Sequence, residues 1–423
     1  MNSPATSMRT NTRYALALLF MVSFFNYMDR YMLAVLLPAI KSDLQLSDTE
    51  IGFITGLAFT LFYATMGIPI ARLADRYSRR NIIAIALTVW SVMTALCGLA
   101  QNFVQLAVAR IMVGVGEAGA SPPSHSLIAD LFPVEKRARA ISVYTLGAPV
   151  GILIGFLLGG WITQLYGWRA ALFTVGIPGI LLALVIYRKL HEPERGAADG
   201  LPRNTEIQPF WFTLKTLMSS PTFRHLSFAT GLYTVLWLGV VQWLPSYFTR
   251  SFGLGIGEVG TWLAIILSTS QIIGMVAGGY LADRLGSGDL RWYVWVPSLA
   301  ILVSTPMFAL TFLTQDSTVA FLSLFLPFMI GVMQGPPTFA VAQGLADVRM
   351  RAMAAALLLL ITNLIGGGIG PQAVGIMSDY LAEQHKQDSL RYSLLAVSLV
   401  FGLWSSLHYF LAGKTIRREF RKS

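Results

Sequence analysis

Two ionisable residues, Arg110 and Glu117, lie inside an apolar, glycine-rich stretch that runs from Phe103 to Ile128. Seven residues advance a helix by about 700°, two turns less roughly 20°, so both side chains project from one helix face, about 10 Å apart. Charged groups are costly in hydrocarbon and mark substrate, ion or proton paths. We therefore predict that this face lines a water-filled path. A buried ion pair that only locks neighbouring helices together is the alternative.

A second charged pair, Asp29 and Arg30, lies in the first apolar segment of the chain. Counting the helical rise from the outer end of each span places Asp29 roughly 13 Å deep. Arg110 is placed roughly 10 Å deep and Glu117 roughly 21 Å deep. We expect Asp29, Arg30 and Arg110 to share one level, with Glu117 deeper. Burial favours the protonated form of a carboxylate and a neighbouring arginine favours its charged form, so its protonation can respond to conformation.

The composition is that of a polytopic membrane protein. Of 423 residues, 55% are hydrophobic and only 12% are charged, which excludes an ordinary soluble domain of this length. The single cysteine, Cys97, provides neither a disulfide nor a thiol-based metal site. The sequence contains no zinc-hydrolase motif, Walker loop or nucleophile elbow with a plausible triad. We expect no enzyme activity, no metal or other cofactor, and no direct drive by ATP.

The net charge of +10 reflects topology and not nucleic-acid binding. With twelve spans, 24 of the 31 lysines and arginines fall on the side that holds both termini, five fall on the other side, and two lie within spans. Cytoplasmic loops of membrane proteins carry such an excess of basic residues. We predict an integral protein of the bacterial inner (plasma) membrane with both termini in the cytoplasm and no nucleic-acid partner.

Twelve apolar segments, each about the length of a membrane span, form two sets of six. We predict an all-α membrane protein with six-helix bundles at 1-190 and 223-423, joined by a polar cytoplasmic linker at 191-222. Ser47 and Glu50 form a capping box, Ser-x-x-Glu, that predicts the start of the second span. The predicted spans lie at about 14–40, 50–72, 81–100, 103–128, 140–164, 168–188, 224–249, 258–282, 292–314, 317–345, 352–381 and 391–413.

The two sets of spans are related by an internal repeat. Six residues of the first half recur 208 positions later, and Ser121-Pro-Pro recurs as Gly335-Pro-Pro at nearly the same spacing. Six spans per half give both halves the same orientation, so the repeat is parallel, about an axis along the membrane normal. The recurring residues are Glu50, Gly52, Leu73, Ala74, Asp75 and Arg76, which return as Glu258, Gly260, Leu281, Ala282, Asp283 and Arg284.

The loop after the second span reads Leu73-Ala-Asp-Arg-Tyr-Ser-Arg-Arg80, with a partial copy after the eighth span. This pattern resembles the signature loop of the major facilitator superfamily, whose fold has twelve transmembrane helices in two parallel-repeat bundles. Ala71 and Ser78 stand where that family usually has glycine, and the second copy lacks the paired arginines. An aspartate beside arginines at a helix end can bond opposing helix termini and be released, as a gate requires. The residues assigned to this cytoplasmic gate are Asp75, Arg76, Arg79, Arg80, Arg139, Asp283 and Arg284.

Two further motifs resemble the spinster-type branch of that superfamily, some of whose eukaryotic members export lysophospholipids or sphingoid phosphates. The motifs are Phe25-Asn-Tyr-Met-Asp-Arg30 and Gly114-Val-Gly-Glu-Ala-Gly-Ala-Ser-Pro-Pro-Ser-His-Ser126. The resemblance implies that Asp29 and Glu117 handle protons and that Arg30 and Arg110 are the charged residues beside them. The ligand does not follow from the fold, because the chemistry of the site decides it.

The spans of the second half contain no Asp, Glu, Lys or Arg in their interiors and carry neutral polar and aromatic residues instead. We predict that the first half handles charge and that the second supplies an apolar and aromatic wall. For any single aromatic residue, a lipid-facing or interfacial place is the commoner one. A pocket of this kind suits an amphipathic organic anion. The residues assigned to substrate binding or charge relay are Arg30, Arg110, Tyr27, Tyr233, Trp237, Gln334 and Asn363.

Glycines at 147, 151, 155, 159 and 160 give the fifth span a small-residue face suited to close helix packing. The same stretch loosely resembles the glycine-proline motif of proton-antiporting exporters. Both explanations stay open at this point.

Together these patterns predict a proton-coupled secondary transporter that moves a small or amphipathic organic anion, lysolipid-like or an organic acid, by alternating access. Its central site is expected between spans one, four, seven and ten, and its partners are the substrate, the proton and the lipid bilayer. We expect a monomer. Uptake of an aromatic or sugar acid is the alternative, and an uncoupled lipid scramblase or a membrane sensor is an alternative of another class.

Overall fold

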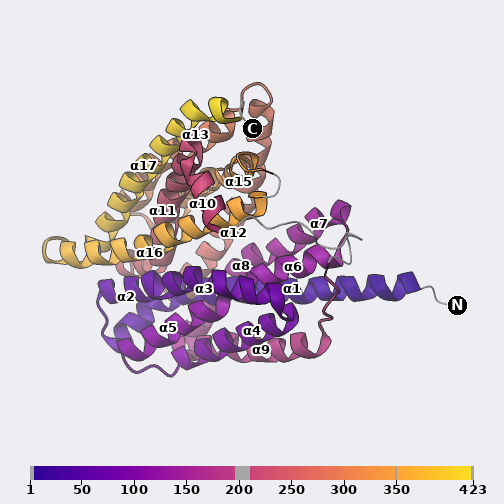
Figure 1. The fold of residues 1–423 in the computed structure, drawn as a ribbon. Coiled ribbons are helices and arrows are strands. Elements are labelled where there is room, and N and C mark those ends of the chain that lie inside the picture. Colours follow the sequence, from indigo (N-terminus) through magenta and orange to yellow (C-terminus); the bar gives the residue numbers. More distant parts are fainter. Residues whose placement is uncertain (1–3, 196–209, 348–349, 421–423) are drawn as a thin grey trace. The chain divides into compact units, whose positions relative to one another are not determined.

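The computed structural model describes residues 4–195, 210–347 and 350–420, and all regular structure in these ranges is helical (Figure 1). The chain divides into two compact units that do not coincide with the two halves of the sequence. Unit 1 is made of Met1–Leu46, Ala58–Asn204 and Ile256–Ala264. Unit 2 is made of Ser47–Leu57, Thr205–Gly255 and Ile265–Ser423.

In unit 1, α1 packs along α8, and α4 packs between α5 and α9. The helices of this unit are α1 (Pro4–Leu44), α3 (Leu57–Arg76), α4 (Arg79–Cys97), α5 (Phe103–Glu117), α6 (Ser121–Leu131), α7 (Val134–Thr145), α8 (Gly147–Tyr166) and α9 (Trp168–Lys189). The first residues of α12 (Ile256–Gly286) also belong to unit 1. There Gln164 Oε1 accepts a hydrogen bond of 2.9 Å from the Gly257 N–H.

In unit 2, α11 packs against α16 and α17, and α13 packs against α14 and α17. The helices of this unit are α2 (Asp48–Thr55), α10 (Phe210–Ser219), α11 (Pro221–Phe252), the remainder of α12, α13 (Trp292–Leu313), α14 (Ser317–Val332), α15 (Gly335–Gly344), α16 (Arg351–His385), the 3-10 turn η2 (Lys386–Asp388) and α17 (Ser389–Phe420).

Ten segments of the described chain are long and apolar enough to cross a membrane. The last of them, Met353–Phe420, includes most of both α16 and α17. With α1, which has 41 residues, these segments account for the twelve predicted spans. The prediction of an all-α membrane protein is therefore confirmed.

Several predicted spans are broken helices. The fourth is interrupted between Glu117 and Ser121, and the tenth between Val332 and Gly335. A proline pair opens the helix that follows each break, because proline lacks the N–H donor and clashes inside a helix but is tolerated in the first turn. The prediction of continuous helices at 103–128 and 317–345 is wrong at these two points. The second span also breaks at Gly56.

The predicted polar linker contains a helix that sequence patterning did not reveal. α10 covers Phe210–Ser219 and packs on α11 and α16. Its buried residues Thr213 and Leu217 are four apart and share one face. Residues 196–209 of the linker lie outside the described ranges.

The small-residue face of α8 lies directly against α1. A Cβ added at Gly151 would be 2.5 Å from the Phe24 carbonyl oxygen, and one added at Gly155 would be 2.8 Å from the Met28 carbonyl oxygen. No larger side chain fits at this spacing without moving the backbone. Close packing therefore explains these glycines.

The predicted capping box at the start of α2 is present, with Ser47 and Glu50 bonding reciprocally. Next to it, the Asp48 carboxylate accepts hydrogen bonds from both terminal nitrogens of Arg250, at 2.6 and 2.5 Å. Ser378 Oγ donates a third, at 2.7 Å. The Asp379 carboxylate accepts from the backbone N–H groups of Asp48 and Thr49, where the helix dipole favours an anion. This network fixes α2 to α11 and α16 within unit 2.

Candidate functional site

Asp29 and Arg110 face each other inside unit 1. Asp29 lies on α1 and is 1% exposed, and Arg110 lies on α5 and is 2% exposed. Arg110 Nη1 is 3.9 Å from Asp29 Oδ1. The other carboxylate oxygen, Oδ2, accepts a short hydrogen bond from Thr94 Oγ1 on α4. Three helices thus meet at one buried carboxylate.

Arg30 and Glu117 form the second ion pair, with Arg30 Nη2 2.6 Å from Glu117 Oε2. Glu117 is the last residue of α5 and is fully buried. The guanidinium of Arg30 also lies 4.7 Å from the ring centroid of Phe59 and 4.8 Å from that of Tyr63, both on α3. A guanidinium this close to aromatic faces gains cation–π stabilisation. It is therefore held by two rings and one carboxylate.

The glycines around Glu117 let α5 approach its neighbours closely. A Cβ at Gly114 would be 2.6 Å from the Phe59 carbonyl oxygen, and one at Gly116 would be 2.7 Å from the Trp90 nitrogen. These contacts bring α3 and α4 against α5 on either side of the carboxylate. The sequence Gly-Val-Gly-Glu therefore buries an acid where a bulkier stretch would hold α3 and α4 away from α5.

Several atoms of this charged group are buried yet make no hydrogen bond within the described protein. They are Asp29 Oδ1, Glu117 Oε1, Arg30 Nε, and Arg110 Nε and Nη1. Buried polar atoms without partners are costly and uncommon in folded proteins. The group, defined as Asp29, Arg30, Arg110 and Glu117, retains free capacity to accept a proton on either carboxylate and to donate to an anion from either arginine.

The structure brings these four residues together. The sequence placed Asp29, Arg30 and Arg110 at one level, with Glu117 deeper, and predicted no ion pairs among them. In the structure Arg30 pairs with Glu117, the residue expected to lie deeper. Adjacent residues of a helix point about 100° apart, so Asp29 and Arg30 turn to different partners.

Unit 2 contains a neutral polar group that we define as Thr230, Gln334, Thr338 and Tyr409. Gln334 Oε1 accepts hydrogen bonds from Tyr409 Oη at 2.6 Å and from Thr230 Oγ1 at 3.1 Å. Thr338 Oγ1 lies 2.7 Å from Tyr409 Oη. Thr230 comes from α11, Tyr409 from α17 and Thr338 from α15. Gln334 is the residue before the first turn of α15, and its side chain joins three helices.

The remaining predicted substrate residues of unit 2 are separate from this group. Tyr233 and Trp237 are buried on α11 with their rings 6.5 Å apart, and Trp237 makes an edge contact with Phe328. Asn363 donates to the Leu359 carbonyl oxygen, one turn earlier in α16. In unit 1, the ring centroid of Tyr27 lies 5.7 Å from the Arg30 guanidinium.

The signature loop of unit 1 is organised around Arg79. This residue is 1% exposed, forms an ion pair with Asp130, and donates from Nε to Glu192 at 2.8 Å. The Glu192 carboxylate also accepts from Ser78 Oγ and from the Arg80 N–H. Burial alone raises the pKa of Glu192, but the hydrogen bonds from Arg80, Arg79 and Ser78 outweigh it and lower that pKa below its ordinary value. The beginning of the linker is thereby fixed to the start of α4.

The other predicted gate residues of unit 1 make weaker contacts. Arg80 lies 5.5 Å from the ring centroid of Tyr187. Arg76 and Arg139 are exposed, and the side chain of Asp75 lies outside the described part of the structure.

In the second copy of the loop, in unit 2, Asp283 and Arg284 form hydrogen bonds with tyrosines. Asp283 Oδ1 accepts a hydrogen bond of 3.0 Å from Tyr293 Oη. Arg284 Nη1 contacts Tyr280 Oη at 3.4 Å. No described histidine, cysteine, aspartate or glutamate residues gather in threes as a metal site requires.

The family of the chain follows from its sequence as a whole. The Major Facilitator Superfamily model matches residues 19–371. The chain belongs to the major facilitator superfamily. Membership makes it a transport protein and an integral membrane protein, and confirms the fold predicted from the signature loop and the repeat.

Individual relatives within the superfamily agree with this assignment. An MFS-type efflux pump of Mycolicibacterium smegmatis is 32% identical over 410 residues, which cover 96% of this chain and 93% of that protein. A probable L-galactonate transporter of Escherichia coli (strain K12) is 29% identical over 286 residues, which cover 65% of this chain and 62% of that protein.

A bacterial homologue of the human lysosomal transporter Spinster, crystallised in an inward-facing and unoccupied conformation, matches with a TM-score of 0.88. The identity is 29%, and the match covers 97% of this chain and 98% of that chain. The resemblance to the spinster-type branch, predicted from residues 25–30 and 114–126, is confirmed.

Sequence reasoning missed several residues of the charged group in unit 1 and of the neutral polar group in unit 2. Thr94 looks like an ordinary polar residue in an apolar helix, although its hydroxyl bonds Asp29. Phe59 and Tyr63 carry a usable signal, because residues four apart share a helix face and both rings contact Arg30. No sequence pattern points to Tyr409 or Thr230, since their partner Gln334 comes from a distant part of the chain.

Proposed function

We propose that this chain is a proton-coupled secondary transporter of an organic anion, in which Asp29 and Glu117 take up and release protons. The observation that carries the proposal is the pairing of two buried carboxylates with the buried Arg110 and the partly buried Arg30 in unit 1, with polar atoms of all four side chains left without hydrogen bonds. A purely structural ion pair would be expected to satisfy those atoms.

The proposed cycle uses charge balance. Each arginine–carboxylate pair is neutral, so a proton that binds Glu117 leaves Arg30 as an uncompensated cation, and a proton on Asp29 does the same for Arg110. A buried cation is costly unless it is paired. The freed guanidinium then binds the carboxylate or phosphate of a substrate, for which its planar fork is suited. Loss of the proton restores the internal pair and expels the anion.

The aromatic residues favour a substrate with an apolar part. Arg30 lies among Tyr27, Phe59 and Tyr63, so an anion at its guanidinium meets ring surfaces. An amphipathic organic anion, lysolipid-like or a smaller organic acid, fits this combination. Tyr233, Trp237, Gln334 and Asn363 in unit 2 are the further residues that we assign to substrate contact.

We further propose that the protein works by alternating access in a bacterial inner membrane, as a monomer with cytoplasmic termini. The excess of basic residues on the side of both termini supports this orientation. The loops around Asp75 and Asp283, with Arg76, Arg79, Arg80, Arg139 and Arg284, are assigned to the cytoplasmic gate. The network that holds Glu192 on the first loop supports that role.

Transport by the purified protein in liposomes with an imposed pH gradient tests the proposal. Labelled lysophospholipid, aromatic acids and sugar acids are offered in turn, with and without the gradient. For the transported compound, Glu117→Gln and Asp29→Asn are expected to abolish the acceleration by the gradient, a loss on the order of tenfold or more. Glu383→Gln, which removes an exposed carboxylate of α16, serves as the matched control and should transport normally.

The proposal is wrong if the gradient accelerates both site variants as much as the unchanged protein. Uptake of a sugar acid is the second candidate, because one relative is named a probable L-galactonate transporter; a response confined to sugar acids would favour it. Lipid movement that ignores the gradient would indicate an uncoupled scramblase. Binding without transport would indicate a sensor.

A further inference from the structure

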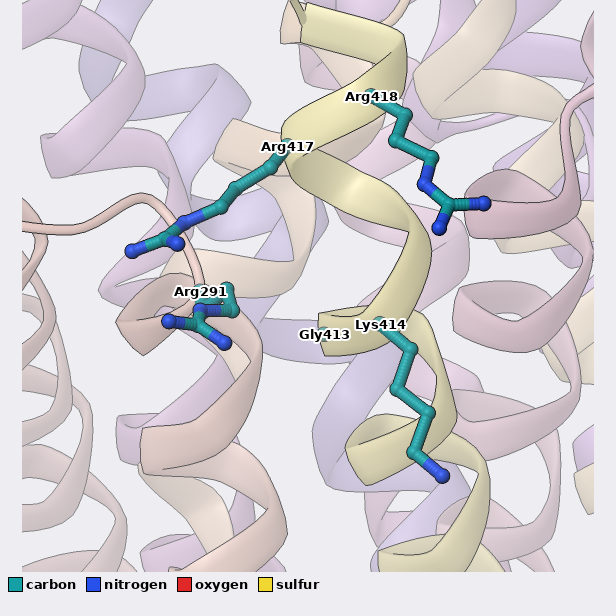
Figure 2. A pocket seen from close by; sticks show the side chains of 5 residues that line it. All are labelled: Arg291, Gly413, Lys414, Arg417 and Arg418. Carbon is teal, nitrogen blue, oxygen red and sulfur yellow. The ribbon is translucent and has the colours of Figure 1, made fainter.

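A basic cavity lies in unit 2 where α13 begins and α17 ends. Its volume is about 270 Å³, and it is lined by Arg291, Gly413, Lys414, Arg417 and Arg418. In Figure 2, Arg291 and Arg417 extend to one side of α17, and Lys414 and Arg418 extend to the other. Tyr409 of the neutral polar group lies one helical turn before Gly413 on the same helix.

The cavity keeps a large positive charge after its internal ion pairs are counted. Asp289 accepts from Arg417 at 2.9 and 2.5 Å and from Arg291 at 3.0 Å, so one carboxylate serves two arginines. Within the described residues, Lys414 and Arg418 have no carboxylate partner in an ion pair. The Glu419 carboxylate is turned toward α11, where it accepts from Ser220 and Thr222. Four cations and one anion leave a net charge of +3.

The Asp289 charge is constant over the physiological range. Hydrogen bonds from the Arg417 side chain and the Arg291 N–H lower the pKa of Asp289 to about 2. Its carboxylate is therefore ionised at neutral pH. The excess of positive charge is a fixed property of this site.

Aromatic rings support the cations. The Arg291 guanidinium lies 4.6 Å from the ring centroid of Trp295, and Lys414 Nζ lies 5.3 Å from that of Phe410. The Trp295 and Phe410 rings stack, with centroids 6.4 Å apart. Tryptophan is enriched at the level of lipid head groups. Cations at a helix end next to such rings are suited to binding a phospholipid phosphate.

One donor at this site is also free. The Trp295 Nε1 is buried and has no hydrogen-bond partner among the described residues. It lies against Gly413, where an added Cβ would be only 2.2 Å away. Gly413 therefore leaves room for the indole beside the cavity that this glycine lines, and a neutral donor accompanies the cationic ones.

We propose that this cavity binds the phosphodiester head group of an anionic phospholipid, such as phosphatidylglycerol, with its acyl chains along the apolar surface of α13 and α17. A basic pocket between transmembrane helices, on the face where they end, is suited to an anionic head group. The alternative source of the same chemistry is a soluble phosphate. The lipid is favoured because Trp295 and Phe410 border the cations, and a free phosphate gains nothing from rings.

The test measures the stabilisation of purified, delipidated protein by dioctanoyl phosphatidylglycerol, dioctanoyl phosphatidylcholine or inorganic phosphate, with thermal unfolding as the readout. Phosphatidylglycerol is expected to raise the unfolding temperature in a saturable manner, and phosphatidylcholine at the same concentration is not. The double variant Lys414→Gln/Arg418→Gln is expected to weaken the apparent affinity about 30-fold, for two lost basic contacts. Both side chains are exposed, so the variant is expected to fold.

The matched control removes two other exposed charges of unit 2, as Lys215→Gln/Arg224→Gln. Arg224 lies near the start of α11, at the same end as the cavity, because Thr222 and Thr415 bond each other across α11 and α17. The control should keep the unchanged affinity. Equal losses in both double variants, or no loss in the first, would overturn the proposal. If inorganic phosphate raised the unfolding temperature as much as phosphatidylglycerol does, the ligand would be a soluble phosphate and the lipid proposal would be wrong.

Discussion

The charged group of unit 1 and the neutral group of unit 2 differ in how completely their polar atoms are hydrogen-bonded. Both bring polar side chains from several helices into an apolar interior. In unit 2, Gln334 accepts from Tyr409 and Thr230, and Thr338 bonds the same tyrosine. In unit 1, both carboxylates keep an oxygen without a hydrogen bond. The neutral group is therefore fully hydrogen-bonded around Gln334, whereas the charged group can still change its protonation and its partners.

The repeat shows how this difference arises. Aligning Pro122 with Pro336, 214 residues apart, places Glu117 at the position of Gly331. A Cβ at Gly331 would be 2.6 Å from Tyr233 Oη, so a phenol occupies the space next to this position. The two halves keep the same helix break before their proline pairs, yet one presents an acid there and the other presents a neutral ring. Proton exchange is therefore expected only in unit 1.

The largest effect is expected when one partner of the Arg30–Glu117 ion pair is removed. Arg30→Gln leaves Glu117, which is fully buried, without its counter-ion. Removal of one partner of a buried ion pair typically costs about 3–5 kcal/mol. Thermal unfolding at pH 8 should show a strong loss of stability, and raising the pH should widen it, since only the charged carboxylate needs the arginine.

The double variant Arg30→Gln/Glu117→Gln provides the control for that experiment. It removes both charges, so most of the lost stability should return. If the Arg30→Gln variant were as stable as the unchanged protein, the Arg30–Glu117 ion pair would contribute nothing to stability. The proposed difference between the charged and the neutral unit would then have no support from stability.

A smaller effect is expected from Thr94→Val. The substitution keeps the shape of the side chain and removes the hydroxyl that donates to Asp29. A hydrogen bond to a charged group contributes about 1.5–3 kcal/mol. The pH at which the transport rate is half-maximal should also move, because the substitution removes a donor that favours the charged carboxylate. A stability change without any change in the pH profile would mean that Asp29 does not exchange protons.

The smallest effect is expected from Tyr409→Phe in unit 2. The ring stays and the hydroxyl that donates to Gln334 is lost, at a cost of about 1 kcal/mol for a neutral hydrogen bond. The pH profile of transport should be unchanged, because no titratable group is involved. A shifted profile would contradict the division between a proton-handling unit and a neutral one.

The membership of the charged group could be predicted from the sequence, because ionisable residues in apolar spans are rare and helical spacing sets their face. Asp29, Arg30, Arg110 and Glu117 were found in this way. Their pairing could not be predicted, since it depends on the rotation of α1 against α5. Close backbone contacts, such as that of Gly114 on α5 with Phe59 on α3, help to fix where the helices lie, and they leave no pattern in the periodicity.

The twelve spans could be predicted from hydropathy, but their breaks and cross-chain bonds could not. Pro122 and Pro336 signal a possible interruption, yet proline inside a span does not always break it, as Pro178 within α9 shows. Asp48 and Arg250 are 202 residues apart, and each reads as a solvated loop charge. Only the folded unit brings them together.

The docking of α2 has a consequence for how the chain can be divided. Unit 2 takes Ser47–Leu57 from the first half of the sequence, and unit 1 takes Ile256–Ala264 from the second. A cut in the linker would leave Arg250 and Ser378 on one fragment and their partner Asp48 on the other. Each compact unit thus contains one short segment from the other half of the sequence. The repeated halves are not interchangeable building blocks, since each half carries an element that completes the other unit.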